Sequence, residues 1–108
     1  MGSCGIPANV REDVVRIIEQ FNRKLPAHYN CIYSARFRGC FLYLDRDDDG
    51  VVGPICRLQY NGDMKNWSFA IYKFSSDRYD PNETWFPGYH LVDGTVEGAM
   101  KAGMEAYT

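Results

Sequence analysis

Residues 33–44, with the sequence YSARFRGCFLYL, are the first of three apolar segments that decide the fold. The second segment is ICRLQY at residues 55–60, and the third is WSFAIYKF at residues 67–74. Their many Tyr, Phe, Ile, Leu and Trp residues favour half-buried β-strands. The segments between them, 45–50 and 61–63, carry the Asp, Asn and Gly residues that are typical of hairpin turns. The sequence therefore predicts an antiparallel meander of three strands.

Helical periodicity on both sides of the meander predicts two flanking helices. In the first, apolar residues recur at helical spacing: Val10, Val14, Ile17, Ile18, Phe21 and Leu25. Asn9 is expected to cap this helix, and Pro26 is expected to end it. The second helix is expected to begin after Thr95, which is a good N-cap residue. Small residues in it predict a close approach to its neighbour: Ala99, Ala102 and Gly103.

The predicted fold is therefore α+β. Its element order is helix, strand, strand, strand and helix, with both helices on one face of a three-stranded antiparallel sheet. A chain of 108 residues is long enough to bury one core, so residues 9–108 are expected to form a single domain. Residues 1–8 are expected to be a flexible N-terminal arm.

Strand alternation divides the predicted sheet into an apolar face and a mixed face. The apolar face is expected to form the core and contains Phe37, Phe41, Tyr43, Cys56, Leu58, Tyr60, Trp67, Phe69 and Ile71. The mixed face is expected to meet water or a partner and contains Arg36, Arg38, Cys40, Leu42, Ile55, Arg57, Gln59, Ser68, Ala70 and Tyr72.

Arginines on the mixed face form the first candidate binding site. It consists of Arg36, Arg38 and Arg57, together with Gln59 and Tyr72. Guanidinium groups can bind phosphate or carboxylate, and Tyr72 could stack on a nucleic-acid base. The alternative is a solvated face, on which these arginines pair with local acids and cover apolar neighbours with their aliphatic stems.

Residues 75–93 form a long irregular segment that is rich in aromatic side chains, and such loops are often functional. The second candidate site lies here and consists of Tyr79, Trp85, Phe86, Tyr89 and His90. These residues could line a pocket or anchor a protein partner. The alternative is that the loop folds back and closes one end of the core.

The acidic segment 45–50 matches the first half of a calcium-binding loop, with carboxylates at Asp45, Asp47 and Asp49 before Gly50. The twelfth position of such a loop should be Glu, but it is Cys56 here. The sequence therefore favours an acidic hairpin turn over a calcium site, and we expect neither a metal nor a cofactor.

Composition limits the classes of function. The formal net charge of −2 argues against binding to nucleic acid through bulk charge. The chain has no apolar stretch of membrane-spanning length and no signal-peptide pattern, so we expect a cytoplasmic protein with reduced cysteines. It also has no nucleophile-elbow motif and no glycine-rich phosphate loop, which disfavours an enzyme.

Residues 55–72, with the sequence ICRLQYNGDMKNWSFAIY, are followed by Tyr79, a Pro-Gly loop, the GTVEGA motif at 94–99 and Tyr107. This pattern resembles a family of small bacterial domains of uncharacterised function, and the resemblance implies no activity and no functional residues. The order of helix, three strands and helix is also similar in topology to double-stranded RNA-binding domains. Only Lys101 stands where that family has a basic cluster.

Three hypotheses about function follow. The first is an interaction or regulatory domain that holds a protein partner, or a second copy of itself through an exposed edge strand, by the arginine face or the aromatic loop. The second is a weak nucleic-acid-binding domain that uses Arg36, Arg38 and Arg57. The third is a small-molecule enzyme with the aromatic loop as a lid.

Overall fold

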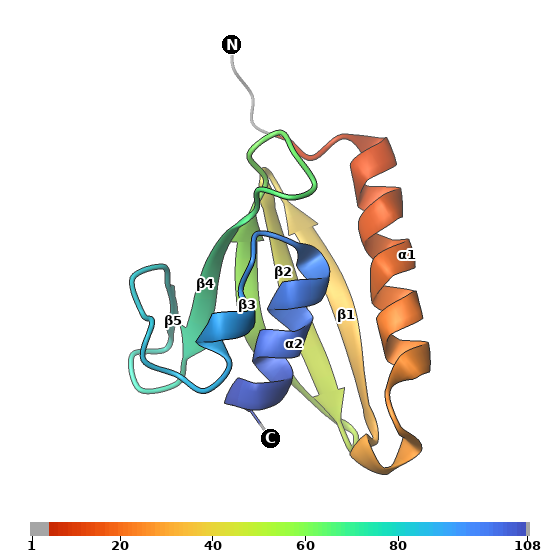
Figure 1. The fold of residues 1–108 in the computed structure, drawn as a ribbon, viewed down its shortest axis with the longest axis vertical. Helices are drawn as coiled ribbons and strands as arrows, with labels where there is room; N and C mark the ends of the chain where they lie inside the picture. Colours follow the sequence, from red (N-terminus) through yellow and green to blue (C-terminus); the bar gives the residue numbers. More distant parts are fainter. Residues whose placement is uncertain (1–4, 108) are drawn as a thin grey trace.

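Five antiparallel strands form one sheet in the order β1-β2-β3-β4-β5, and two helices cover one of its faces (Figure 1). The computed structural model describes residues 5–107. The elements are α1 (Ala8–Lys24), η1 (Ala27–Tyr29), β1 (Cys31–Arg38), β2 (Phe41–Asp48), β3 (Val51–Gln59), β4 (Ser68–Lys73), β5 (Arg78–Asp80), η2 (Tyr89–Leu91) and α2 (Val96–Ala106).

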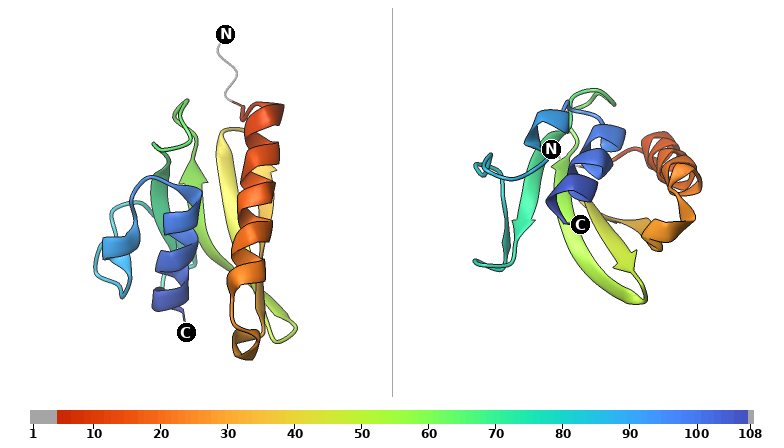
Figure 2. Two further views of the ribbon diagram at one scale, coloured as in Figure 1. Left: turned by 45° about the vertical axis from the view of Figure 1, so that its right-hand side comes forward. Right: turned by 60° about the horizontal axis from the view of Figure 1, so that its bottom comes forward.

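Both helices lie on the same side of the sheet, with α1 beside β1 and α2 over the middle strands (Figure 2). We call this side the inner face and the opposite side the outer face. The largest fully buried side chains lie between the helices and the inner face: Val14, Tyr33, Leu42, Leu44, Cys56, Leu58, Val96 and Met100. The core is therefore built between one sheet face and two helices, as the sequence predicts.

The number of strands differs from the prediction, because residues 33–44 contain a turn. Gly39 has φ +60 and forms a two-residue reversal with Cys40 between β1 and β2. Residues 45–48, which are three aspartates and Arg46, continue β2 instead of forming a loop. The next reversal is at Asp49 and Gly50, with φ +56 and +91. Positive φ at both positions is what a two-residue hairpin of type I′ requires. The loop after β4 adds the short strand β5.

The division of residues between the faces is also partly corrected. Phe41 and Tyr43 lie on the outer face, because Leu42 pairs with Leu58 and is fully buried in the core. The strand pairing shifts between Leu44 and Asp45. That β-bulge adds Ile55 to β3, and Ile55 is buried in the core rather than lying on the mixed face as predicted.

The helix boundaries agree with the sequence except at the first cap. Residues 1–4 of the predicted arm lie outside the described residues, whereas Ile6 is buried in the core. The N-cap of α1 is Pro7 rather than Asn9, and the helix ends shortly before Pro26 as predicted. The prediction for Thr95 is confirmed, because its hydroxyl accepts a hydrogen bond from the Gly98 amide at 3.0 Å.

No helix in residues 5–107 is long and apolar enough to cross a membrane. Cys31 and Cys56 are free thiols, whereas Cys40 is disulfide-bonded, which corrects the expectation that all the cysteines are reduced. The cytoplasmic location stays a prediction.

The close approach of α2 to the sheet can be tested at Gly103. A methyl group added there would lie 2.5 Å from Tyr33 Oη and 2.6 Å from Ile55 Cγ2. In a helix, replacing Gly by Ala normally stabilises by about 1 kcal/mol, but here the overlap should reverse the sign. We expect Gly103→Ala to lower the free energy of unfolding by about 1–3 kcal/mol in urea denaturation. Gly53→Ala is the control, because nothing lies within 4 Å of its added methyl group; equal effects of the two substitutions would contradict the packing.

The start of α2 predicts a dependence of stability on pH. Hydrogen bonds from the Thr95 hydroxyl (2.6 Å) and amide (3.1 Å) lower the pKa of Asp93 below its usual value. A carboxyl whose pKa is depressed in the folded state stabilises the fold above its unfolded pKa of about 3.9, and this contribution is lost as the pH falls through the folded pKa. Asp93→Asn should therefore be less stable than the parent above about pH 4. The difference in stability between the variant and the parent should shrink in more acidic buffer, as measured by thermal unfolding across pH. A difference that stays constant with pH would contradict a stabilising role for the Asp93 carboxylate.

Candidate binding site on the outer sheet face

The outer face brings together all five residues of the predicted arginine site. Directly paired residues share a face, so the pairing of Arg36 with Tyr43, of Tyr43 with Arg57 and of Arg57 with Ala70 defines one surface. The members of this surface, which we call the arginine face, are Arg36, Arg38, Phe41, Tyr43, Asp45, Arg57, Gln59, Tyr72 and Tyr79. Both helices lie on the inner face and leave this surface uncovered (Figure 2).

Arg36 has a partner within the chain. Its Nε and Nη2 donate to the two carboxylate oxygens of Asp45 at 2.5 and 3.1 Å. The Asp45 side chain is only 11% exposed, and a buried carboxylate needs such charged donors. The hydrogen bonds that Arg36 donates to Asp45 raise the pKa of Arg36 above its usual value, so this guanidinium stays charged and ion-paired. The predicted pairing of these arginines with local acids therefore holds for Arg36.

Arg57 has a different environment. Its guanidinium carbon lies 4.6 Å from the ring centre of Phe41 and 5.6 Å from that of Tyr79. These are cation–π distances, and the rings hold the side chain without using all of its N–H groups. Within residues 5–107, no carboxylate forms an ion pair with Arg57 or with the exposed Arg38. Two of the three guanidinium groups are therefore available to a ligand.

Aromatic rings support this surface from β2, β4 and β5. The ring centre of Tyr79 lies 5.3 Å from that of Tyr43 and 5.1 Å from that of Tyr72, with edge-to-face geometry in both pairs. The hydroxyl of Tyr72 donates to Asp77, which raises the pKa of Tyr72 to about 12. Phe41 and Tyr43 are not among the predicted site residues, because strand alternation without a turn at Gly39 places them in the core. The signal that could have found them is Gly39, which marks the turn that sets the register of β2.

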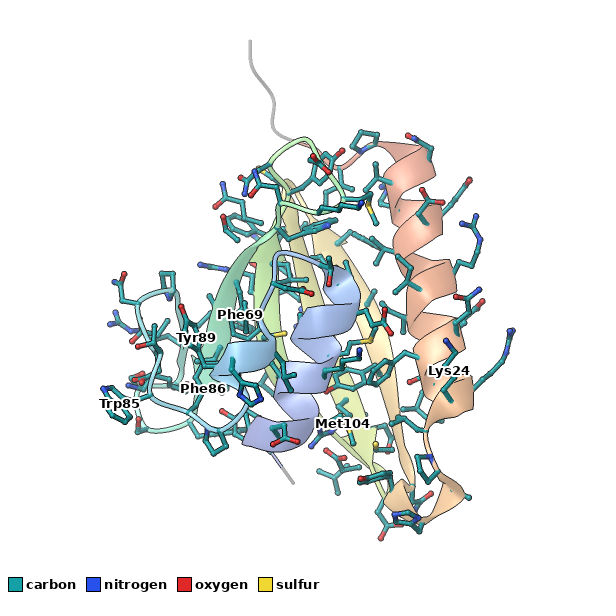
Figure 3. All side chains as sticks on the ribbon, in the orientation of Figure 1. Lys24, Phe69, Trp85, Phe86, Tyr89 and Met104 are labelled. Carbon is teal, nitrogen blue, oxygen red and sulfur yellow. The ribbon has the colours of Figure 1, made fainter. Side chains whose placement is uncertain are left out.

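The residues of the aromatic loop do not form one site (Figure 3). Tyr79 belongs to the arginine face. Phe86 stacks on Phe69 with 5.9 Å between the ring centres, and its ring centre lies 5.6 Å from that of Tyr89. Trp85 is 94% exposed and points away from the domain, and His90 is also exposed. The loop thus closes one end of the core with Phe86 and leaves Trp85 in solvent.

The three aspartates considered for calcium bind other partners. Asp45 pairs with Arg36 on the outer face, Asp47 accepts from the Gly50 amide at 2.7 Å, and Asp49 accepts from Asn30 at 2.6 Å. No group of three His, Cys, Asp or Glu residues that could hold a metal ion occurs in the described part of the chain. The acidic segment therefore serves strand pairing and hairpin geometry.

A groove of about 680 Å³ lies on the other side of the molecule, near the end of α2, and is lined by Tyr29, Cys31, Arg46, Asp48, Val51, Gly53, Pro54, Ile55, Phe74, Met104, Ala106 and Tyr107. Its main polar group is Arg46, whose guanidinium is already bound to Asp48, Gly103 and Tyr107. Burial raises the pKa of the Cys31 thiol at this groove, which keeps the thiol protonated and a weak nucleophile. The sequence does not predict this groove, because the acidic composition of residues 45–50 places Arg46 in a turn rather than in β2.

Comparisons with protein-family models, curated proteins and solved structures found no significant match to this chain. The resemblance to small bacterial domains therefore stays a prediction. The topological similarity to double-stranded RNA-binding domains was based on three strands, whereas this sheet has five.

The two environments in the aromatic loop can be separated by substitution. We expect Phe86→Ala to lower the free energy of unfolding by about 2 kcal/mol, roughly half the cost for a fully buried Phe, because it removes the stack on Phe69. Trp85→Ala should change this free energy by less than about 0.5 kcal/mol. Urea denaturation of both variants gives the comparison. A larger loss of unfolding free energy for Trp85→Ala than for Phe86→Ala would contradict the placement of Phe86 against the core and of Trp85 in solvent.

Proposed function

We propose that this protein is a non-enzymatic interaction domain that binds a partner segment bearing carboxylates on its arginine face. The observation that carries this proposal is the environment of the Arg57 guanidinium. Its guanidinium is held between Phe41 and Tyr79 and has no acid to pair with in residues 5–107.

The chemistry of this arrangement fits carboxylate recognition. A guanidinium that stacks on a ring through its flat face keeps its in-plane N–H groups free, and these match the two oxygens of a carboxylate. Arg and Tyr are also the residue types that contribute most to protein interfaces. Since the Phe41 and Tyr79 rings already restrain Arg57, less side-chain entropy is lost when a partner binds.

A nucleic acid is the second candidate, because the same face offers cations for phosphate and rings for stacking. The net charge of −2 weighs against a long phosphate backbone, whose affinity comes from many cationic contacts, whereas a short acidic segment needs only the few guanidinium groups of this face. The enzyme hypothesis has less support. Trp85 and Phe86 point in different directions, which does not suit a lid, and burial raises the pKa of both free thiols, Cys31 and Cys56.

The proposal is tested by retention on immobilised poly-L-glutamate and on immobilised oligo(dT). We expect salt-sensitive retention on poly-L-glutamate, weakened at least about tenfold in the double variant Arg38→Ala, Arg57→Ala, since each lost charged hydrogen bond costs about 1.5–3 kcal/mol. The matched control is Arg11→Ala, Arg23→Ala, which removes the same charge from α1 and should leave retention unchanged.

Two outcomes would overturn the proposal. Retention on oligo(dT) alone, lost in the same double variant, would assign the arginine face to nucleic acid. Absence of retention on poly-L-glutamate, or an equal loss in the α1 control, would remove the acidic partner.

A further inference from the structure

One residue on the outer edge of β1, Tyr33, already has a hydrogen-bond partner for its backbone. β1 is the first strand of the sheet, so one of its sides faces away from β2. On that side the Asn22 side chain of α1 donates to the Tyr33 carbonyl at 3.0 Å and accepts from the Tyr33 amide at 2.9 Å. Asn22 therefore pairs with Tyr33 much as the peptide group of a neighbouring strand would.

Strand alternation shows which other groups share this side. Because the amide and carbonyl of Tyr33 point away from β2, those of Ala35 and Phe37 do as well, and those of Ser34, Arg36 and Arg38 point towards β2. Among the described residues, no hydrogen-bond partner lies opposite the outward groups of Ala35 and Phe37. These outward groups are therefore hydrogen-bonding positions that no described residue fills.

We propose that β1 accepts an extended acidic segment of the partner as a sixth strand, paired through Ala35 and Phe37. The acidic character of the segment rests on the proposed function, and the strand pairing is the new element. Main-chain hydrogen bonds supply affinity in this mode of recognition, and side chains on one face supply specificity.

The arginine side chains of β1 favour an acidic segment as the added strand. Arg36 and Arg38 are exposed on the outer face next to the open groups of β1. In an added antiparallel strand, the residues opposite them form non-hydrogen-bonded pairs, in which side chains approach most closely. An acidic residue opposite Arg38 would meet a guanidinium that has no ion pair within residues 5–107, whereas one opposite Arg36 would share a guanidinium that already pairs with Asp45. The residues between them would lie beside Ala35 and Phe37.

A second copy of β1 fits this edge less well. Antiparallel self-pairing centred on Arg36 places Arg36 opposite its own copy, and pairing centred on Phe37 places Arg36 opposite Arg38. Like charges directly opposite each other are destabilising. Pairing centred on Ala35 avoids this clash, but it needs the Tyr33 groups that Asn22 already occupies. An acidic strand avoids both problems.

The experiment uses the full chain and an eight-residue peptide of alternating Val and Glu, with blocked ends, in calorimetric titration. Ala35→Pro removes an outward N–H and leaves the β1–β2 hydrogen bonds in place, and edge strands tolerate proline at such positions. We expect this variant to keep its circular dichroism spectrum and to bind the peptide at least about tenfold more weakly. A peptide of alternating Val and Lys should not bind.

A matched pair of peptides tests the same contact without changing the protein. N-methylation at the Val residues removes the donors that would face β1, whereas N-methylation at the Glu residues removes those that face away. We expect only the first modification to abolish binding. This comparison decides the question if Ala35→Pro does not fold.

Failure of this inference can be told apart from failure of the proposed function. Binding that survives both Ala35→Pro and Val methylation, but is lost in Arg38→Ala, Arg57→Ala, would refute strand addition and retain an acidic partner on the arginine face. Retention on poly-L-glutamate without binding of the peptide would also refute strand addition. Absence of both would refute the two proposals together.

Discussion

Tyr33 of β1 contacts both helices and Arg46 of β2, and the arrangement of the domain depends on these contacts. Its backbone is bound by Asn22 of α1, and its buried hydroxyl donates to the Met100 carbonyl of α2 at 2.8 Å. The Arg46 guanidinium lies 5.7 Å from its ring centre and binds the carbonyls of Gly103 and Tyr107 at the end of α2. A cation at a helix C-terminus complements the helix dipole. One edge-strand residue and one arginine thus fix both helices on the inner face.

Placing both helices on one face determines what the other face can be. Because alternate residues of each strand point to opposite faces, the commitment of Leu42, Leu44 and Leu58 to the core sends Phe41, Tyr43 and Arg57 outward. The outer face has no helix to bury its rings, so arginine stems and guanidinium groups pack on them instead. Asp45 then separates the arginines into two kinds, since it forms an ion pair with Arg36, whereas Arg57 and Arg38 have no ion pair within residues 5–107.

The sequence predicted the elements with strong periodicity and missed those set by single residues. The apolar stripe of α1 and the Thr95 cap were sufficient for the two helices, and the three arginines were correctly placed on one face. Residues 33–44 alternate so regularly that Gly39 was not recognised as a turn, although only a positive φ at this residue allows the reversal. The aspartates of residues 45–48 predict a turn, because Asp is depleted in strands. Their place in β2 depends on Arg36 and Arg46, contacts that local sequence does not show.

The two edges of the sheet are protected unequally, and this asymmetry follows from the chain path. At one edge, β5 has three residues and is followed directly by Pro81, so it offers a partner little backbone. At the other edge, β1 has eight residues, and α1 reaches its backbone through Asn22 near the start of the strand. The remainder of β1 runs beside α1 with no hydrogen bond to it among the described residues, and it carries Arg36 and Arg38 on its outer face, where their charge opposes indiscriminate pairing (Figure 1). Protection by charge, unlike coverage by a helix, is removed by a strand of opposite charge, and this makes β1 the more selective edge as well as the more open one.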